Sequence, residues 1–285
     1  MKFSHTSKVR LGVFAASVAV LVTAMWGLTS AWGHVDVDRG LRNVVTSIET
    51  DADSPARRGF SSKFTELSNA SFDADSVQML DFDVSSGTVE TKVIDDDKVT
   101  VSEFAHVKKG LKPARAATEG LATVENGVLK IAKFGYDDER AAGRVVTVGI
   151  PRKLAGNLAR VNLNVKSGDA TIDGVTCEEL DLKVTSGDIE FKGGVTETLD
   201  AEVGSGDVEM ELDQAPASSM NVREGSGDIE LSIPKGTGFT AQLTMGSGDF
   251  ESDFLSNDVD GSDVSNLTFD NGDKSAAYRI EIDSG

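Results

Sequence analysis

The sequence predicts an all-β protein, a β-solenoid of stacked coils of about 20 residues each, preceded by a single transmembrane helix. Three observations lead to this fold class. The tripeptide Ser-Gly-Asp recurs five times, at spacings of 19, 19, 21 and 21 residues. Apolar and polar residues alternate before each repeat, which is typical of strands with one buried face. A segment near the N-terminus, residues 11–32, contains no charged residue.

The N-terminal segment predicts export from the cytoplasm. Residues 1–10 form a basic flank with three basic residues and no acidic one, and residues 11–32 follow without a charge. As a helix, this run would span roughly 33 Å, enough to cross the hydrocarbon core of a bilayer. We therefore expect a signal-anchor, with the basic flank in the cytoplasm and the chain after Gly33 outside. The alternative is a signal peptide cleaved near Ala31, which would release a secreted protein.

A linker is expected between the membrane segment and the head. Residues 33–71 are largely polar, and Leu41, Val44, Val45 and Ile48 have the spacing of a short helix. Residues 72–285 form the predicted strand-repeat head.

The first part of the head contains strands that do not belong to the tripeptide repeat. Glu125-Asn126-Gly127 predicts a hairpin turn between two of them. Lys108–Arg115 is expected to be a basic, solvated loop, and the acidic residues 253–275 a loop with a degenerate coil. The expected strands are Leu80–Val84, Thr88–Ile94, Lys98–Phe104, Gly127–Phe134 and Arg144–Ile150.

The repeat defines the coils. We aligned the five tripeptides with a variant at Ser86-Gly87 and with Ser284-Gly285, and compared the residues two, four and six positions before each serine. Of these 21 residues, only Glu224 is not apolar, and we expect it to form a local bulge with Gly225. Glycine suits the corner because tight turns often need a positive φ. The repeat turns are Ser167, Gly168, Ser186, Gly187, Ser205, Gly206, Ser226, Gly227, Ser247 and Gly248.

A regular period favours stacked coils over hairpins. A unit of two short strands cannot bury its apolar face alone, whereas stacked units build a continuous core. An antiparallel β-sandwich of hairpins, with Ser-Gly as the turn, is the alternative architecture. In a solenoid the last coil would be exposed, so Tyr278–Gly285 is expected to be covered by a partner.

Composition excludes several functional classes. The net charge of −19 argues against a nucleic-acid partner, because phosphate binding requires basic residues. One cysteine, Cys177, excludes an internal disulfide and a multi-cysteine metal site, and we place it in an inert loop between coils. Three histidines supply a catalytic triad poorly. We therefore predict no catalytic residues, no cofactor and no small-molecule substrate.

The strongest candidate site is a column of aspartates at the corners. Like charges on coils stacked at about 4.8 Å repel by roughly 1 kcal/mol in water, and a bound cation such as calcium would relieve this repulsion. The alternative is that each aspartate caps its own turn. The column consists of Asp169, Asp188, Asp207, Asp228 and Asp249.

A glycan-acting enzyme is the minor alternative. Asp188 with Glu190, and Asp228 with Glu230, share a strand face as paired carboxylates. Nearly every coil carries such a pair and no pair is distinguished from the others, which favours a solvated acidic face.

Residues 72–285 resemble a known bacterial family. The opening Phe72-Asp73-Ala74, the sequence Leu80-Asp81-Phe82, the strand end Ile150-Pro151, the segment Ile233-Pro234-Lys235-Gly236 and the serial Ser-Gly-Asp coils are similar to the bacterial adhesins of the DUF4097 type. These β-strand-repeat proteins are related to LiaG-like envelope proteins. The resemblance implies a solenoid head on a protein of the bacterial cell membrane, without catalytic residues.

Two kinds of partner are compatible with a non-enzymatic solenoid head on the cell membrane. An adhesin would bind a cell surface or a protein on it, and a modulator of an envelope-stress sensor would act by protein–protein contact. The strong negative charge favours a basic protein or peptide over an anionic wall polymer.

Overall fold

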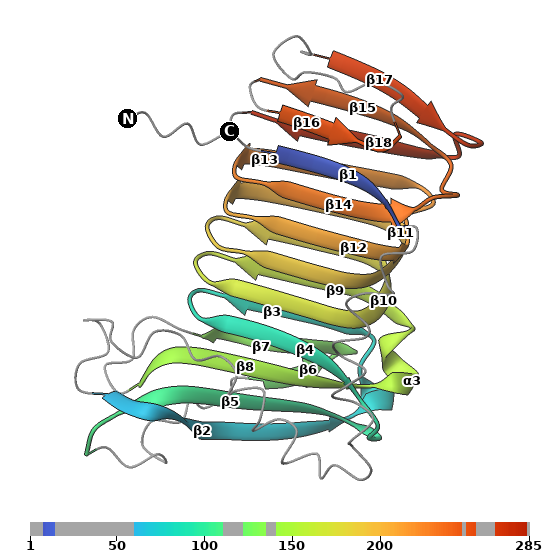
Figure 1. Ribbon diagram of the computed structural model, residues 1–285. Coiled ribbons are helices and arrows are strands. Elements are labelled where there is room, and N and C mark those ends of the chain that lie inside the picture. Colours follow the sequence, from blue (N-terminus) through green and yellow to red (C-terminus); the bar gives the residue numbers. More distant parts are fainter. Residues whose placement is uncertain are drawn as a thin grey trace, which may run out of the picture.

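The computed structural model of the 285-residue chain describes residues 8–14, 60–110, 122–134, 141–246, 249–254 and 266–283. The expected helix over residues 41–48, most of the basic loop and the corner Ser247-Gly248 lie outside these residues. Almost all the described chain is β-strand, and the strands stack into a tall column of parallel coils (Figure 1). The all-β, solenoid-like fold class is therefore confirmed.

Each coil contributes one rung to each of two facing layers, which we call sheet 1 and sheet 2. Two long strands, β10 (Asp169–Val184) and β11 (Ile189–Ser205), bend at register shifts and pass through both layers. Sheet 1 runs in spatial order through β2 (Phe60–Asp73), β5 (Lys98–Lys108), β8 (Ala141–Pro151), β4 (Thr88–Ile94), the first halves of β10 and β11, β12 (Val208–Gln214), β14 (Ile229–Pro234), β1 (Lys8–Phe14) and β16 (Asp249–Ser252).

Sheet 2 holds the strands that precede the corners. Its rungs are parallel from β7 to β15, and antiparallel pairs close both ends. Sheet 2 runs through β6 (Ala122–Glu125), β7 (Val128–Phe134), β3 (Met79–Val84), β9 (Leu158–Val165), the second halves of β10 and β11, β13 (Ser219–Ser226), β18 (Ala276–Ile282), β15 (Phe239–Met245) and β17 (Asn266–Asn271).

Alternation along each strand builds the core between the sheets. In sheet 2, Leu180, Leu199, Met220 and Tyr278 are register neighbours, and all are at most 2% exposed. Inward residues of each coil therefore stack on the same residues of the next coil, which gives one continuous apolar core. This parallel stacking replaces the alternative sandwich of hairpins.

The lower end of the solenoid is an antiparallel base. β2 pairs with β5 and β5 with β8, and Asn126 and Gly127 adopt positive φ in the hairpin turn between β6 and β7, as the sequence predicts. A buried ion pair between Glu103 and Arg144 joins β5 to β8. The short helices η2 (Ala74–Ser76) and α3 (Arg152–Ala155) connect strands of this region.

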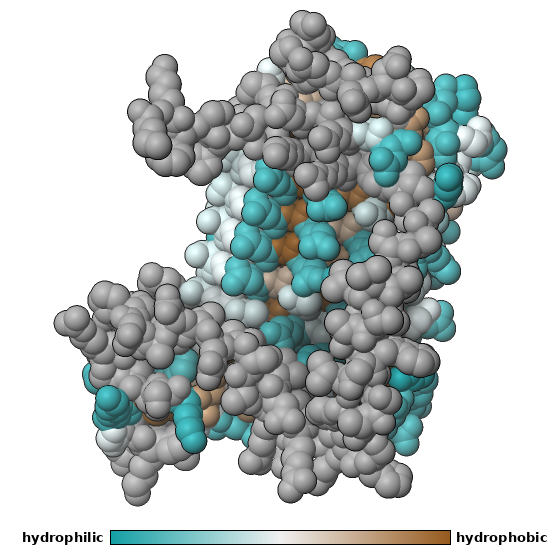
Figure 2. Space-filling view, viewed as in Figure 1, coloured by the Kyte–Doolittle hydropathy of each residue, from teal (hydrophilic) through white to brown (hydrophobic). Residues whose placement is uncertain are grey.

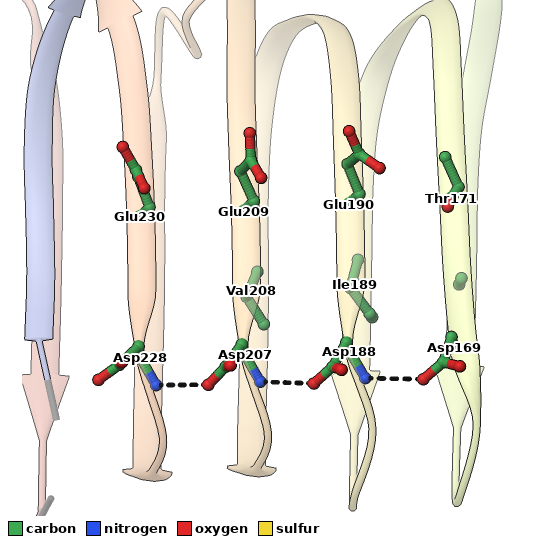
Figure 3. A pocket seen from close by; sticks show the side chains of 11 residues that line it. Asp169, Thr171, Asp188, Ile189, Glu190, Asp207, Val208, Glu209, Asp228 and Glu230 are labelled. Carbon is green, nitrogen blue, oxygen red and sulfur yellow. Dashed lines mark hydrogen bonds between the residues drawn. The ribbon is translucent and has the colours of Figure 1, made fainter. Parts of the chain in front are cut away.

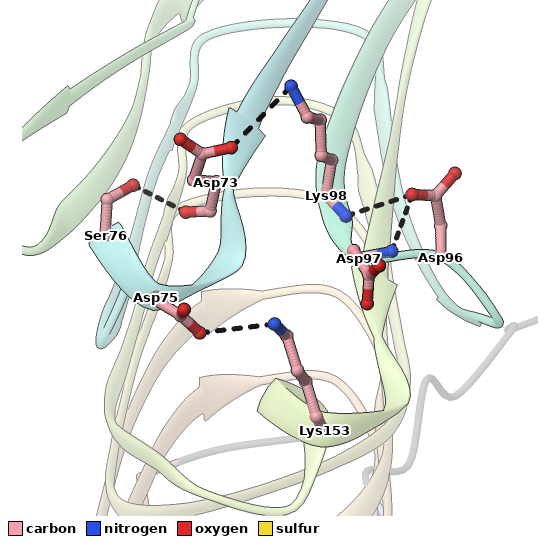
Figure 4. A network of polar contacts seen from close by, with 7 residues as sticks. All are labelled: Asp73, Asp75, Ser76, Asp96, Asp97, Lys98 and Lys153. Atoms are coloured by element: carbon pink, nitrogen blue, oxygen red, sulfur yellow. Dashed lines mark hydrogen bonds and ion pairs between the residues drawn. The ribbon is translucent and has the colours of Figure 1, made fainter.

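Polar contacts fix the entry into the head (Figure 4). Lys98 Nζ lies 3.6 Å from Asp73 Oδ1, and Lys153 Nζ lies 3.2 Å from Asp75 Oδ1. Asp96 Oδ1 accepts hydrogen bonds from the backbone amides of Asp97 and Lys98 in the turn before β5. Asp73, Asp75 and Asp96 are thus used in ion pairs and a turn at the surface of the base.

The linker is shorter than expected. Residues 60–71 belong to β2, a strand paired with β5 over most of its length, so the prediction that residues 33–71 form a linker is wrong for this part. β2 lies at the edge of sheet 1, where a strand pairs with only one neighbour. Because many of its residues are polar, the sequence pattern did not predict a strand there.

The N-terminal prediction is also corrected in part. Leu11–Phe14 belong to strand β1 instead of beginning a helix, and residues 15–32 lie outside the described residues. A short apolar run with residues in alternation fits a strand as well as a helix. In the part of the chain that the structure describes, no helix has the length and apolar character needed to cross a membrane.

The C-terminal strand does not form the last coil. β18 lies between β13 and β15, pairs with both in parallel, and buries Tyr278, whose hydroxyl donates a hydrogen bond to the Pro216 carbonyl at 2.9 Å. The expectation that Tyr278–Gly285 form an exposed coil covered by a partner is therefore wrong for the described part of that segment. Asn266–Asn271, part of the segment expected to be a loop with a degenerate coil, form β17 at the upper end of sheet 2.

Candidate functional site

The corners of sheet 1 stack directly on one another. Gly168, Gly187, Gly206 and Gly227 have φ between 126° and 146°. A Cβ on Gly187 would lie 1.9 Å from the Gly168 carbonyl oxygen, so a side chain cannot fit there. The glycine of each Ser-Gly-Asp turn thus allows the close backbone approach that stacking requires.

The aspartates after these glycines form a hydrogen-bonded ladder (Figure 3). The backbone amides of Asp188, Asp207 and Asp228 each donate to the Oδ1 of the aspartate one coil earlier, at 3.4, 3.1 and 3.2 Å. The carboxylates of Asp169, Asp188 and Asp207 therefore each cap the corner of the next coil. The alternative prediction was that each aspartate caps its own turn. The carboxylates do accept hydrogen bonds from turn amides, but these amides belong to the turn of the next coil.

A second acidic column runs beside the ladder, two residues further along each strand. Glu190, Glu209 and Glu230 are register neighbours on β11, β12 and β14. The spacing of residues along a strand places the two columns about 7 Å apart. The carboxylates of both columns point out of the same face of the sheet (Figure 3).

The two columns border a shallow groove of about 550 Å³, which we call the acidic groove. Ala170, Ile189 and Val208 lie at its floor but are at most 2% exposed, and apolar residues are visible between columns of hydrophilic ones in Figure 2. Among the described residues that line it, none is basic. Seven carboxylates line it, from Asp169, Asp188, Asp207, Asp228, Glu190, Glu209 and Glu230.

Among the described side chains, Lys192 lies near the border of this groove. Lys192 Nζ contacts Glu190 Oε1 at 2.6 Å and Glu211 Oε2 at 3.9 Å. The hydrogen bond to Glu190 raises the pKa of Lys192, so the amine stays protonated and neutralises part of one rung.

Sheet 2 has a different outer surface, because its acids are paired with bases or amides. Lys183 contacts Glu202 at 2.7 Å and Arg223 contacts Glu281 at 2.9 Å. The Asn221 side chain donates to Asp200 at 2.7 Å. The concentration of one sign of charge is therefore a property of the acidic groove and not of the solenoid surface in general.

The predicted cation column is only partly assembled. The described residues contain no group of three or more His, Cys, Asp or Glu side chains arranged to hold a metal ion. Calcium prefers six to eight oxygen ligands, and the ladder offers one aspartate per coil. Asp249 is separated from the coil of Asp228 by the rung of β1. Calcium binding stays a prediction, to be tested by comparing melting temperatures in calcium and in chelator.

The structure does not distinguish one carboxylate pair of the acidic groove from the others, as a catalytic site would require. The pairs Asp188–Glu190 and Asp228–Glu230 both lie in the acidic groove as equivalent rungs. His106, the histidine of the described chain, is buried in the base with its ring 4.1 Å from that of Phe64. His106 is therefore not among the described residues that line the acidic groove.

Two predicted irregularities are resolved by the structure. Glu224 continues the inward column of β13 in register between Val203 and Ile282 and is 2% exposed, so the expected bulge is wrong. Cys177 lies in strand β10 instead of a loop, and burial raises the pKa of its thiol to about 12. The expectation that the thiol is inert agrees with this burial.

Comparison with known proteins identifies the family. A solved structure titled "putative cell adhesion protein", from Clostridium sporogenes, is 10% identical, with a TM-score of 0.41, and covers 77% of this chain and 94% of its own. A "putative adhesin" from Parabacteroides merdae is 11% identical, with a TM-score of 0.32, and covers 76% and 94%. No curated protein matches. The model of the family described as Toastrack DUF4097 matches residues 75–285, and the chain belongs to this family.

Proposed function

We propose that this protein is a non-enzymatic cell-envelope protein whose solenoid head binds a positively charged protein or cell surface through the acidic groove. The observation that carries the proposal is the set of seven carboxylates that four successive coils present to the acidic groove, where none of the described lining residues is basic. Rows of like charge raise the local concentration of an oppositely charged partner and accelerate its association. The regular rung spacing suits an extended chain with repeated basic side chains.

Charge neutralisation tests this proposal. The probe is a fluorescent decalysine peptide, and the readout is its Kd for the full chain at increasing salt. In the variant Glu190→Gln/Glu209→Gln/Glu230→Gln, we expect the affinity to fall at least about tenfold at low salt, since three charges leave the site. The fall should be smaller at high salt, where screening already weakens the interaction.

A matched control separates the groove from general acidity. Glu178, Glu197 and Asp213 are exposed acids that do not line the groove. The variant Glu178→Gln/Glu197→Gln/Asp213→Asn has the same net charge and should lose no more than about twofold in affinity. Equal losses in the two variants would contradict a defined site.

Anchoring by residues 11–32, with the head outside the membrane, belongs to the same proposal. Photo-crosslinking in cells from positions 190 and 230 then distinguishes the partners. Recovery of a membrane protein supports modulation of an envelope sensor, and recovery of foreign surface material supports adhesion.

A further inference from the structure

The insertion of β18 into sheet 2 leaves one rung of sheet 1 to be filled from elsewhere. β13 and β15 are separated by β18, which pairs with both. In the sequence, two residues separate the end of β13 from the start of β14, and three residues separate the end of β15 from the start of β16. β14 and β16 must therefore lie about 9.6 Å apart, which is two strand spacings. The gap has the width of one strand.

In this structure, the N-terminal segment fills the gap. β1 pairs in parallel with β14 on one side and with β16 on the other (Figure 1). Its backbone continues both ladders, which would otherwise end in unpaired strand edges. The rung at this level is thus assembled from opposite ends of the chain, with β1 in sheet 1 and β18 in sheet 2.

The register matches apolar positions with the core. Val9, Leu11 and Val13 are the register partners of Ile229, Leu231 and Ile233. These three residues of β14 are at most 1% exposed. Because a shift of one residue exchanges the two faces of a strand, this register is specific for alternating sequences.

The register also matches charges. Arg10 is the partner of Glu230 on β14 and of Glu251 on β16, and Lys8 is the partner of Asp249. In the backbone register, basic positions of β1 therefore lie between acidic positions of β14 and β16, and opposite charges at neighbouring positions favour strand pairing.

We propose that the gap between β14 and β16 is a strand-acceptor site for an extended segment with alternating basic and apolar residues, and that Lys8–Phe14 is its internal ligand. A partner segment with the same alternation, added in the same parallel orientation, competes for this site. Strand addition of this kind obtains affinity from backbone hydrogen bonds and specificity from alternate side chains. The proposal does not rest on the acidic groove, because strand pairing alone defines the gap.

Engineered cysteines test the occupancy. Register partners on adjacent strands lie within disulfide reach, so the full-length variant Arg10→Cys/Glu230→Cys should form an intramolecular disulfide after mild oxidation. The control is Arg10→Cys/Glu190→Cys. Glu190 belongs to the same acidic column but lies three rungs from β1, about 14 Å away. Buried Cys177 is present in both variants.

The expected result is a disulfide yield at least about fivefold higher in the first variant than in the control, at equal melting temperatures. Equal yields would overturn the proposal. A competition then tests the chemistry of the site. An excess of the peptide Lys-Val-Arg-Leu-Gly-Val-Phe should lower the yield severalfold, whereas Glu-Val-Glu-Leu-Gly-Val-Phe should not. Identical effects of both peptides would overturn the proposed charge specificity.

Discussion

At the scale of single residues, the corner glycines decide whether coils can stack. Gly187 combines a φ of 134° with a Cβ position 1.9 Å from a backbone oxygen, and neither a rotamer change nor a side-chain movement can relieve that contact. Sequence repetition identifies these glycines as turns. Their contact with the glycine of the coil below becomes visible only once the coils are stacked.

Substitution of one corner glycine should therefore be costly. We expect Gly187→Ala to lower the free energy of unfolding by about 2–3 kcal/mol, from backbone strain and displacement of the neighbouring coil. Gly236→Ala is the control, since a Cβ there meets nothing within 4 Å, and it should change stability by less than about 0.5 kcal/mol. Urea unfolding measures both, and comparable losses would refute the stacking explanation.

Buried titrating side chains make stability depend on alkaline pH. Burial raises the pKa of Cys177 from 9.0 to about 12 and the pKa of Tyr278 from 10.0 to about 12. Both groups are neutral when protonated, so their contribution is complete below about pH 9 and is lost as the pH rises towards 12. The structure thus becomes less stable in this window.

A cysteine variant isolates one part of this effect. Cys177→Ala removes the thiol, so the stability advantage of the native chain over this variant should shrink between pH 9 and pH 11. Chemical denaturation at pH 8, 9, 10 and 11 measures the advantage. If it stays constant over this range, the thiol does not titrate as we predict.

At the scale of elements, the antiparallel base is joined by a buried ion pair. Arg144 of β8 and Glu103 of β5 are 5% and 0% exposed, and Ser68 of β2 donates a hydrogen bond to Glu103 at 3.1 Å. These contacts link the three outermost strands of sheet 1. None of them follows from the sequence, because the residues are far apart and carry no repeat.

Removing one partner of this ion pair should lower the stability of the protein more than replacing both partners by apolar residues. Arg144→Met leaves the Glu103 carboxylate buried without its guanidinium, and we expect a loss of about 3–5 kcal/mol. The double variant Arg144→Met/Glu103→Leu buries no charge and should be clearly more stable than the single variant. Thermal and urea unfolding compare the two, and a double variant that is less stable than Arg144→Met would contradict the argument.

At the scale of the whole molecule, the N-terminal segment cannot form a membrane helix and strand β1 at the same time. As a membrane helix it would begin at Leu11, whereas in the solenoid Leu11–Phe14 belong to β1. The bilayer and the strand-acceptor site therefore compete for the same four residues. If the segment anchors the protein, the acceptor site is left open for a partner.

Reconstitution into lipid vesicles tests this competition. The disulfide yield of Arg10→Cys/Glu230→Cys should fall several-fold in vesicles relative to detergent, because membrane insertion withdraws the segment from sheet 1. The control is the same variant mixed with preformed vesicles without reconstitution. An unchanged yield after reconstitution would contradict anchoring through residues 11–32.

The repeating unit, the inward and outward faces of its strands, the corner residues and the acidic character of one surface could all be predicted from the amino-acid order. These features depend on the period-two alternation of apolar residues and on the corner glycines. Both can be recognised in the sequence without knowing which strands are neighbours in space. Which coils are adjacent became known only from the folded arrangement of the strands. β18 lies between β13 and β15, β1 separates the coils of Asp228 and Asp249, and β2 extends the base. Strand order is set by pairing between distant segments, and many pairings satisfy the same alternation equally well.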